Sequence, residues 1–277
     1  TGAISDSTKI GAVIGSEYFS GLIDEVKIYN YALTADEINQ DYNQGFSAVM
    51  GQSSSNTGST AAAGSASQEY CIPGDTSACS PPVAEWKLDE GVGTTAYDTS
   101  GNGNHGVFGS GSSAPSWTMG KTGNGLNFDG TNDFIDNTDL TLTGPFTYSF
   151  WINNSDTGTR MWSSGTGTQK FGTVGGNFFV RVISSSDNTV AFPSTNTWHH
   201  IVLSRDSNNK IDLYINGGSP TRLFSDIAQS GTTYLQIIGR ANDGSGQHFQ
   251  GQIDQVRIYN YARTPAQIAW DYNRGKP

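Results

Sequence analysis

The loop Asp98–Gly106, with the sequence DTSGNGNHG, gathers several oxygen-bearing side chains in a short span. It places one carboxylate, Asp98, and two amides, Asn102 and Asn104, among glycines that let backbone carbonyls turn inward. Calcium prefers about six to eight oxygen ligands of these kinds, so the loop indicates a calcium site. The alternative is that Asp98 and the two asparagines only hold a tight Asx-turn.

Paired carboxylates for glycoside hydrolysis are scarce in this chain. Such chemistry needs two carboxyl groups flanking the scissile bond. From residue 83 onward there are two glutamates, Glu85 and Glu90, and both lie in the opening segment. Asp133, Asp136 and Asp139 are close in sequence, but a spacing of three puts neighbours on opposite faces of a strand. We therefore expect no catalytic residues and a protein that is not an enzyme.

Glycan binding would require exposed aromatic rings beside polar groups. Trp162, in GTRMWSSG, is flanked by small polar residues typical of a loop, and we predict a ligand-binding cluster of Trp162, Arg160 and Arg181. Trp151 and Trp198 fall inside apolar segments and are expected in the core. The alternative for Trp162 is packing at the rim of the fold.

The two cysteines, Cys71 and Cys79, lie in CIPGDTSACSPP, where a Pro-Gly-Asp turn can bring the sulfurs together. A disulfide between them would place the protein in an oxidising compartment outside the cytoplasm. The alternative is two free thiols.

Composition favours short strands joined by turns. The chain holds 35 glycines and only 14% charged residues, and Thr, Ser and Asn are abundant. Apolar residues alternate with polar ones in KIDLYING, at 210–217, and similar segments recur from Val83 to the C-terminus. This spacing predicts a β-sandwich of on the order of a dozen strands. The net charge of −10, with no basic patch, speaks against nucleic acid as a partner. No apolar run reaches membrane-spanning length.

Residues 19–45 and 249–275 are near copies, identical at about sixteen of twenty-seven positions. Each copy predicts a strand, a turn, a second strand and a closing helix, which in the second copy starts with a Thr264–Gln267 capping box. Strict alternation in that second strand places Ile253 and Arg257 on one face, with Asp254 and Val256 on the other.

The duplication suggests a domain organisation. We interpret residues 1–48 as the C-terminal strands and closing helix of a preceding, incomplete domain, and 49–82 as a flexible Ser/Gly/Ala-rich linker that contains the cysteine loop. Residues 83–277 would form a complete domain. We expect the exposed strand edges of 1–48 to pair with another chain or with the missing part of their own domain.

Several segments, in order, carry a family resemblance: AEWKLDEGVGTTAYDTSGNGNHGV, GLNFDGTNDFI, FTYSFWI, WHHIVLSRD, LYINGG and FQGQIDQVRIYNYARTPAQI. They resemble the laminin-G-like jelly-roll domain of the concanavalin A-like lectin/glucanase superfamily, of the kind found in secreted and surface proteins of bacteria. The resemblance implies an all-β, two-sheet antiparallel jelly-roll sandwich with a short C-terminal helix. It also implies that Asp254 joins Asp98, Asn102 and Asn104 in a structural calcium site; otherwise Asp254 caps a backbone amide.

These observations lead to an expected function. We expect a non-catalytic, calcium-stabilised binding module for glycans or surface polymers, repeated within an extracellular or cell-surface protein. A second hypothesis is a spacer or assembly domain of an extracellular array that binds no small ligand. A glycoside hydrolase is a third hypothesis, disfavoured by the scarcity of glutamate.

Overall fold

A computed structural model describes residues 70, 72, 80–137, 140–142, 144–155, 160–163, 170–181, 188–225, 233–234, 237–240 and 247–274. The chain separates into two compact units, Thr1–Phe46 and Ser47–Pro277, and every described residue belongs to the second. The proposed partial domain at 1–48 and the Cys71–Cys79 disulfide lie outside the described residues and stay predictions.

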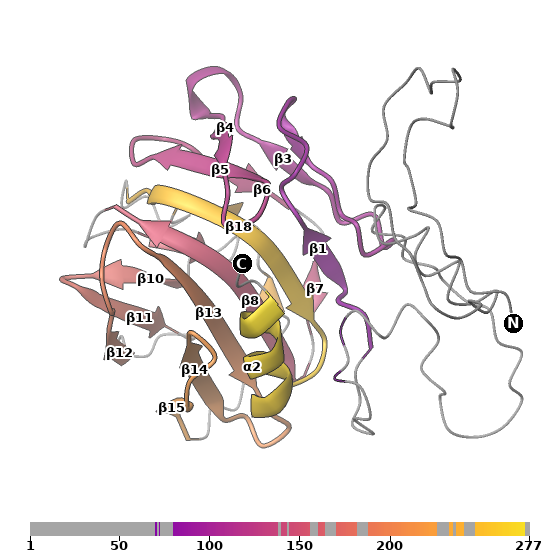
Figure 1. Ribbon diagram of the computed structural model, residues 1–277, viewed down its shortest axis with the longest axis vertical. Coiled ribbons are helices and arrows are strands. Elements are labelled where there is room, and N and C mark those ends of the chain that lie inside the picture. Colours follow the sequence, from indigo (N-terminus) through magenta and orange to yellow (C-terminus); the bar gives the residue numbers. More distant parts are fainter. Residues whose placement is uncertain are drawn as a thin grey trace, which may run out of the picture. The chain divides into compact units, whose positions relative to one another are not determined.

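Two antiparallel sheets form the body of the second unit (Figure 1). Sheet 1 has the strand order β15-β14-β13-β8-β18-β5-β4, and β1 also pairs with β18. Its strands are β1 (Ala84–Trp86), β4 (Ser116–Met119), β5 (Asn124–Asp129), β8 (Phe146–Asn154), β13 (Trp198–Arg205), β14 (Ile211–Ile215), β15 (Thr221–Phe224) and β18 (Gln250–Tyr259).

Sheet 2 has the order β12-β11-β10-β9-β17-β6-β3-β2. Its strands are β2 (Thr95–Ala96), β3 (Gly106–Phe108), β6 (Ile135–Asp136), β9 (Arg160–Ser163), β10 (Lys170–Val174), β11 (Asn177–Arg181), β12 (Asn188–Ala191) and β17 (Ile237–Ile238). The described part also contains a small ribbon of β7 (Thr141–Leu142) and β16 (Thr233–Tyr234), a 3-10 turn η2 (Gly111–Ser113) and the helix α2 (Pro265–Arg274). The predicted jelly-roll sandwich with a short C-terminal helix is confirmed.

The core lies between the two sheets and is built from alternate residues of their strands. Sheet 1 contributes Phe150 and Ile152 from β8, and sheet 2 contributes Trp162, Phe171 and Phe178; each is at most 3% exposed. The ring centroids of Phe150 and Phe171 lie 5.7 Å apart in a stacked arrangement that joins the two sheets. Alternation along each strand leaves the other residues on the outer faces of the sandwich.

A β-bulge in β18 corrects the predicted alternation of that strand. The pairing of β18 with β8 shifts register between Asp254 and Arg257, and Gln255 has a φ of 50°. Ile253 and Val256, three residues apart, therefore both enter the core. Arg257 pairs with Ser149 on the outer face, so it does not share a face with Ile253 as strict alternation implied.

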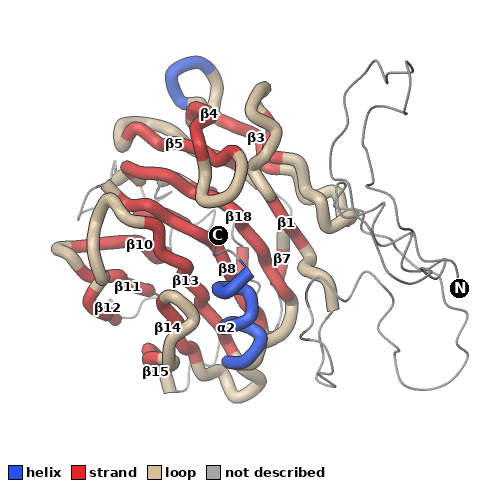
Figure 2. Tube along the Cα trace, viewed as in Figure 1, coloured by secondary structure: helices blue, strands red, loops and turns tan. Residues whose placement is uncertain are grey.

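The closing helix has the predicted start. The Thr264 backbone N–H donates to Gln267 Oε1 at 3.0 Å, and the Gln267 backbone N–H donates to Thr264 Oγ1 at 3.2 Å, so the capping box is confirmed. Ile268 of the helix packs on Val202 and Tyr214, which places α2 on the outer face of sheet 1 (Figure 2). Within the described residues, no helix is both long enough and apolar enough to cross a lipid bilayer.

Candidate functional site

The Asp98 carboxylate holds its own loop together. Its Oδ1 accepts the backbone N–H groups of Glu85 and Ser100, each at 2.9 Å, and its Oδ2 accepts that of Asn104 at 2.9 Å. The side chain amides of Asn102 and Asn104 both donate to the carbonyl of Val83, at 3.1 and 2.7 Å. The loop is therefore tied to the start of β1 through hydrogen bonds that satisfy both carboxylate oxygens.

Asp254 lies in a different set of contacts, under the turn between β4 and β5. Its Oδ2 accepts the Thr122 N–H at 3.0 Å, and its Oδ1 accepts the Gln255 N–H at 2.7 Å. The side chain is fully buried. Burial, with a smaller contribution from the charge of Asp89, raises the pKa of Asp254 to about 7.

The four residues implied as calcium ligands take part in two separate sets of hydrogen bonds. Asp98 and Asp254 share no hydrogen-bond partner, and each points its oxygens at backbone N–H groups. Across the described ranges, no cluster of three or more His, Cys, Asp or Glu side chains is arranged to hold a metal. Asp98 behaves as the Asx-turn alternative predicted, and the calcium site stays a prediction.

The proposed cluster of Trp162, Arg160 and Arg181 is corrected by the structure. Trp162 is 1% exposed and packs against Phe171 at 5.4 Å between ring centroids, so its ring faces the core and cannot stack on a sugar. Arg181 pairs with Lys170, the neighbour of Phe171 in β10, so it lies on the opposite face of sheet 2 from Trp162. The side chain of Arg160 lies outside the described part.

Both glutamates of the domain have structural partners. Glu85 is 1% exposed, and its Oε1 accepts Arg257 Nε at 2.7 Å. Its Oε2 accepts the hydroxyls of Thr99, at 2.6 Å, and Tyr70, at 3.1 Å. Burial alone would raise the pKa of Glu85, but the charge of Arg257 and the other partners hold it below its ordinary value. Glu90 accepts the Tyr97 N–H at 2.8 Å.

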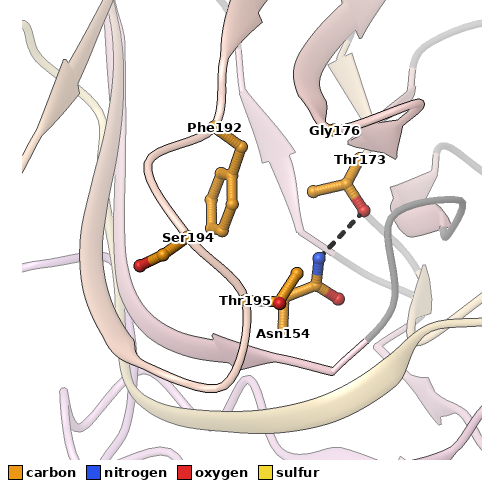
Figure 3. A pocket seen from close by; sticks show the side chains of 6 residues that line it. All are labelled: Asn154, Thr173, Gly176, Phe192, Ser194 and Thr195. Carbon is orange, nitrogen blue, oxygen red and sulfur yellow. Dashed lines mark hydrogen bonds between the residues drawn. The ribbon is translucent and has the colours of Figure 1, made fainter.

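A pocket of about 240 Å³ is lined by residues from both sheets (Figure 3). Described residues lining it come from the end of β8, from β10 and its turn, and from the segment after β12: Asn154, Thr173, Gly176, Phe192, Ser194 and Thr195. Asn154 and Thr173 are buried, and the Asn154 side chain amide donates to Thr173 Oγ1 at 3.2 Å. Every one of these lining side chains is uncharged.

The aromatic wall of this pocket is held in place by its neighbours. Phe192 is half-buried, and its backbone N–H donates to the Gly176 carbonyl at 3.0 Å. The ring meets that of His199 edge-on, with centroids 5.1 Å apart. His199 is fixed by Ser194 and Asn216, at 3.1 and 3.0 Å, and burial lowers its pKa. Figure 3 shows the Phe192 ring on one side of the pocket and the Asn154–Thr173 pair on the other. Such an arrangement of apolar ring and neutral hydrogen-bonding groups suits a small polyhydroxylated ligand.

A family model described as the concanavalin A-like lectin/glucanases superfamily, of the laminin G type, matches residues 128–269. Together with the two-sheet jelly roll, this match defines the class of the protein. The chain belongs to this superfamily. No curated protein matches the sequence.

Solved structures with the same fold include carbohydrate-bound and toxin domains. Domain 4 of AbnA, a GH43 extracellular arabinanase from Geobacillus stearothermophilus, solved in complex with arabinotriose, is 21% identical, with a TM-score of 0.55 over 69% of this chain and 98% of that domain. The binding domain of Paraclostridial Mosquitocidal Protein 1 is 16% identical, with a TM-score of 0.52 over 70% of this chain and 52% of its own. The botulinum neurotoxin serotype D binding domain is 14% identical, with a TM-score of 0.52, and the matched part spans 51% of that chain. At these identities the likeness shows the fold alone.

Proposed function

We propose that the domain is a non-catalytic binding module that recognises a glycan on a surface, within a secreted or cell-surface protein. The pocket beside Phe192 carries this proposal, because it combines a half-buried ring with the hydroxyls of the exposed Ser194 and the half-buried Thr195, beside the buried Asn154–Thr173 pair. Sugar hydroxyls need such neutral donors and acceptors, and an aromatic ring can stack on the apolar face of a sugar.

The volume of the pocket limits the size of the ligand that it can hold. Ligand pockets for drug-sized molecules are roughly 300–1,000 Å³, and this one, at about 240 Å³, is smaller. It therefore suits one sugar ring or a chain end. The similar solved structures support a glycan as the ligand, since one of them was solved with arabinotriose and others are named as binding domains.

The proposed module does not hydrolyse the glycan that it binds. Glu85 is locked in an ion pair with Arg257 at 2.7 Å, so it is a poor general acid. None of the described pocket residues carries a carboxyl group. Incubation with the glycans that bind, followed by an assay for released reducing ends, should show no hydrolysis.

A glycan array with Phe192→Ala tests the pocket. We expect the wild type to bind a defined set of neutral glycans, and the variant to lose at least about tenfold in affinity, because the stacking wall is removed. Tyr97→Ala is the matched control, since Tyr97 is an aromatic residue, 55% exposed, beside β2 at the far edge of sheet 2. Equal binding by the two variants would contradict the pocket assignment, and no binding by the wild type would favour the spacer hypothesis.

A further inference from the structure

The helix α2 covers only part of the outer face of sheet 1. Tyr272 of the helix stacks on Trp151 and His200, with ring centroids 5.6 and 6.1 Å apart. Ile268 packs on Val202 and Tyr214. Figure 1 shows the short helix in front of the lower part of this sheet. Trp151 and His200 are paired across β8 and β13. The next row of paired residues on the same face consists of side chains that are half or fully exposed.

That neighbouring row crosses five strands in register. Trp198 pairs with Asn153, Asn153 with Gln252, Gln252 with Asn127, and Asn127 with Ser116. Directly paired residues share a face, and Asn153 alternates with the core residue Ile152, so the row points outward. Adjacent strands lie about 4.8 Å apart, so the row is roughly 19 Å long. We call these five residues the amide row.

The amide row offers hydrogen-bonding groups to the solvent. Within the described part, its internal side chain contact is the donation from Asn153 Nδ2 to Gln252 Oε1 at 3.2 Å. Gln252 Nε2 reaches Thr118 Oγ1 only at 3.5 Å, and the Asn127 amide makes no hydrogen bond to another described residue. Three half-exposed amides and the exposed Ser116 hydroxyl therefore present both donors and acceptors along a line. Trp198, half-exposed, closes one end.

Three features indicate what this surface binds. Its five side chains carry no charge, and Lys121 beside it lies over the Trp151 ring, so the row itself lacks the run of cations that a nucleic acid or another polyanion needs. Four of its five strands are internal to sheet 1, with backbone groups already paired, so an added peptide strand has no edge to join there. The groups that remain available are amides, a hydroxyl and an aromatic ring, which are the groups that bind sugar hydroxyls and sugar faces.

We propose that the amide row is a second binding site, which holds an extended, uncharged polysaccharide across the strands of sheet 1. This site is distinct from the pocket beside Phe192, although the two adjoin in sequence. Asn154 enters the pocket, while the preceding Asn153 points to the outer face. Likewise, the segment that lines the pocket with Phe192 and Thr195 leads directly into Trp198.

Affinity electrophoresis in gels that contain soluble polysaccharides tests this site. The probes are arabinan, xyloglucan, mannan and dextran as neutral chains, and polygalacturonate as a charged one. We expect at least one neutral chain to retard the wild type. Asn127→Ala and Gln252→Ala should each weaken that retardation roughly three- to tenfold, as expected for the loss of a hydrogen-bonding group. Trp198→Ala should weaken it at least as much.

Two controls separate this proposal from the pocket. Asn208→Ala removes an exposed amide from the turn at the other end of β13 and should migrate like the wild type. Phe192→Ala should lose short glycans on the array but retain most of the retardation by long chains. The amide row is refuted if no neutral chain retards the wild type, if polygalacturonate alone does, or if only Phe192→Ala alters migration. Asn127→Ala, at a half-exposed site, keeps the test valid if Trp198→Ala fails to fold.

Discussion

The outer face of sheet 1 has two halves of opposite chemistry. The half under α2 and Tyr70 is closed and charged: Glu85 pairs with Arg257, and Arg263 pairs with Asp271 at 2.9 Å, with three of these four side chains at most 3% exposed. The amide row is open and neutral. A charge buried without a partner is costly, so the closed half can keep its ions only as complete pairs. The open half has no such constraint, and substitutions there should alter contacts rather than folding.

The largest expected effect is on the Glu85–Arg257 pair. Arg257→Met removes the cation and leaves the buried Glu85 carboxylate without it, which should cost roughly 3–5 kcal/mol of unfolding free energy. Urea denaturation followed by tryptophan fluorescence measures this. The double variant Glu85→Gln, Arg257→Met should recover part of the loss, because no uncompensated charge remains. If the free energy of unfolding of Arg257→Met lies within about 1 kcal/mol of the wild-type value, the two halves do not differ in the way proposed.

Asp254, at the border of the two halves, should make stability depend on pH. Its pKa of about 7 in the fold exceeds its ordinary value of 3.8, so the folded state binds the proton more tightly. The contribution of Asp254 to the free energy of unfolding is fully present below about pH 3.8 and is lost as pH rises through about 7. The total loss is on the order of 4 kcal/mol. His200, whose pKa burial lowers to about 3, stabilises the fold as pH rises to about 6.5 and so opposes Asp254. The Asp254 contribution is therefore measured as the thermal midpoint of the wild type minus that of Asp254→Asn, and this difference should fall from about pH 5 to 8.

Asp254→Asn is the control for this titration, because it cannot ionise. We expect the midpoint of this variant to rise with pH relative to that of the wild type over the same range, because the histidine titrations remain and that of Asp254 is gone. The wild-type series is repeated with calcium and with a chelator, since a cation at Asp254 would favour the ionised carboxylate and stabilise the fold at high pH. A midpoint that is higher with calcium than with the chelator would support the predicted calcium site, and an unchanged midpoint would contradict it.

A smaller effect is expected at Tyr70, which lies in the segment predicted to be a flexible linker. Its side chain is 2% exposed, its hydroxyl donates to Glu85, and its carbonyl accepts Arg263 Nη2 at 2.9 Å. Tyr70→Phe removes only the hydroxyl and its bond to a charged group, so the loss should be roughly 1.5–3 kcal/mol. Differential scanning calorimetry measures it. Tyr97→Phe, on an exposed tyrosine, is the matched control and should leave the midpoint unchanged.

The sequence predicts the fold well because the sandwich depends on local alternation and turn chemistry. The alternation in β14 and the Thr264–Gln267 capping box are both present as expected. The sequence does not predict the register shift in β18. The bulge at Gln255 moves Arg257 to the outer face, and no residue propensity in the sequence indicates this bulge.

The candidate sites were harder to predict, because a site depends on which strands lie side by side. Trp162 has the small polar neighbours of a loop residue, but its register with Phe171 directs it into the core. Trp198, in an apolar segment, lies instead on the outer face beside Asn153. Phe192 is followed by a proline, a serine and a threonine, and no feature of these residue types in the sequence marks the ring as the wall of a pocket.

The smallest expected effect completes the comparison. Asn127→Ala should change the unfolding free energy by less than about 0.5 kcal/mol, because its half-exposed amide makes no hydrogen bond to another described residue and leaves no buried group unsatisfied. Urea denaturation of Asn127→Ala and of Arg257→Met under the same conditions compares the loss of unfolding free energy in the two halves. A loss above about 1.5 kcal/mol would mean that the row holds the sheet together, and its weaker polysaccharide binding could then be a folding defect. With stability unchanged, any loss of retardation by Asn127→Ala has to come from contacts made by that amide.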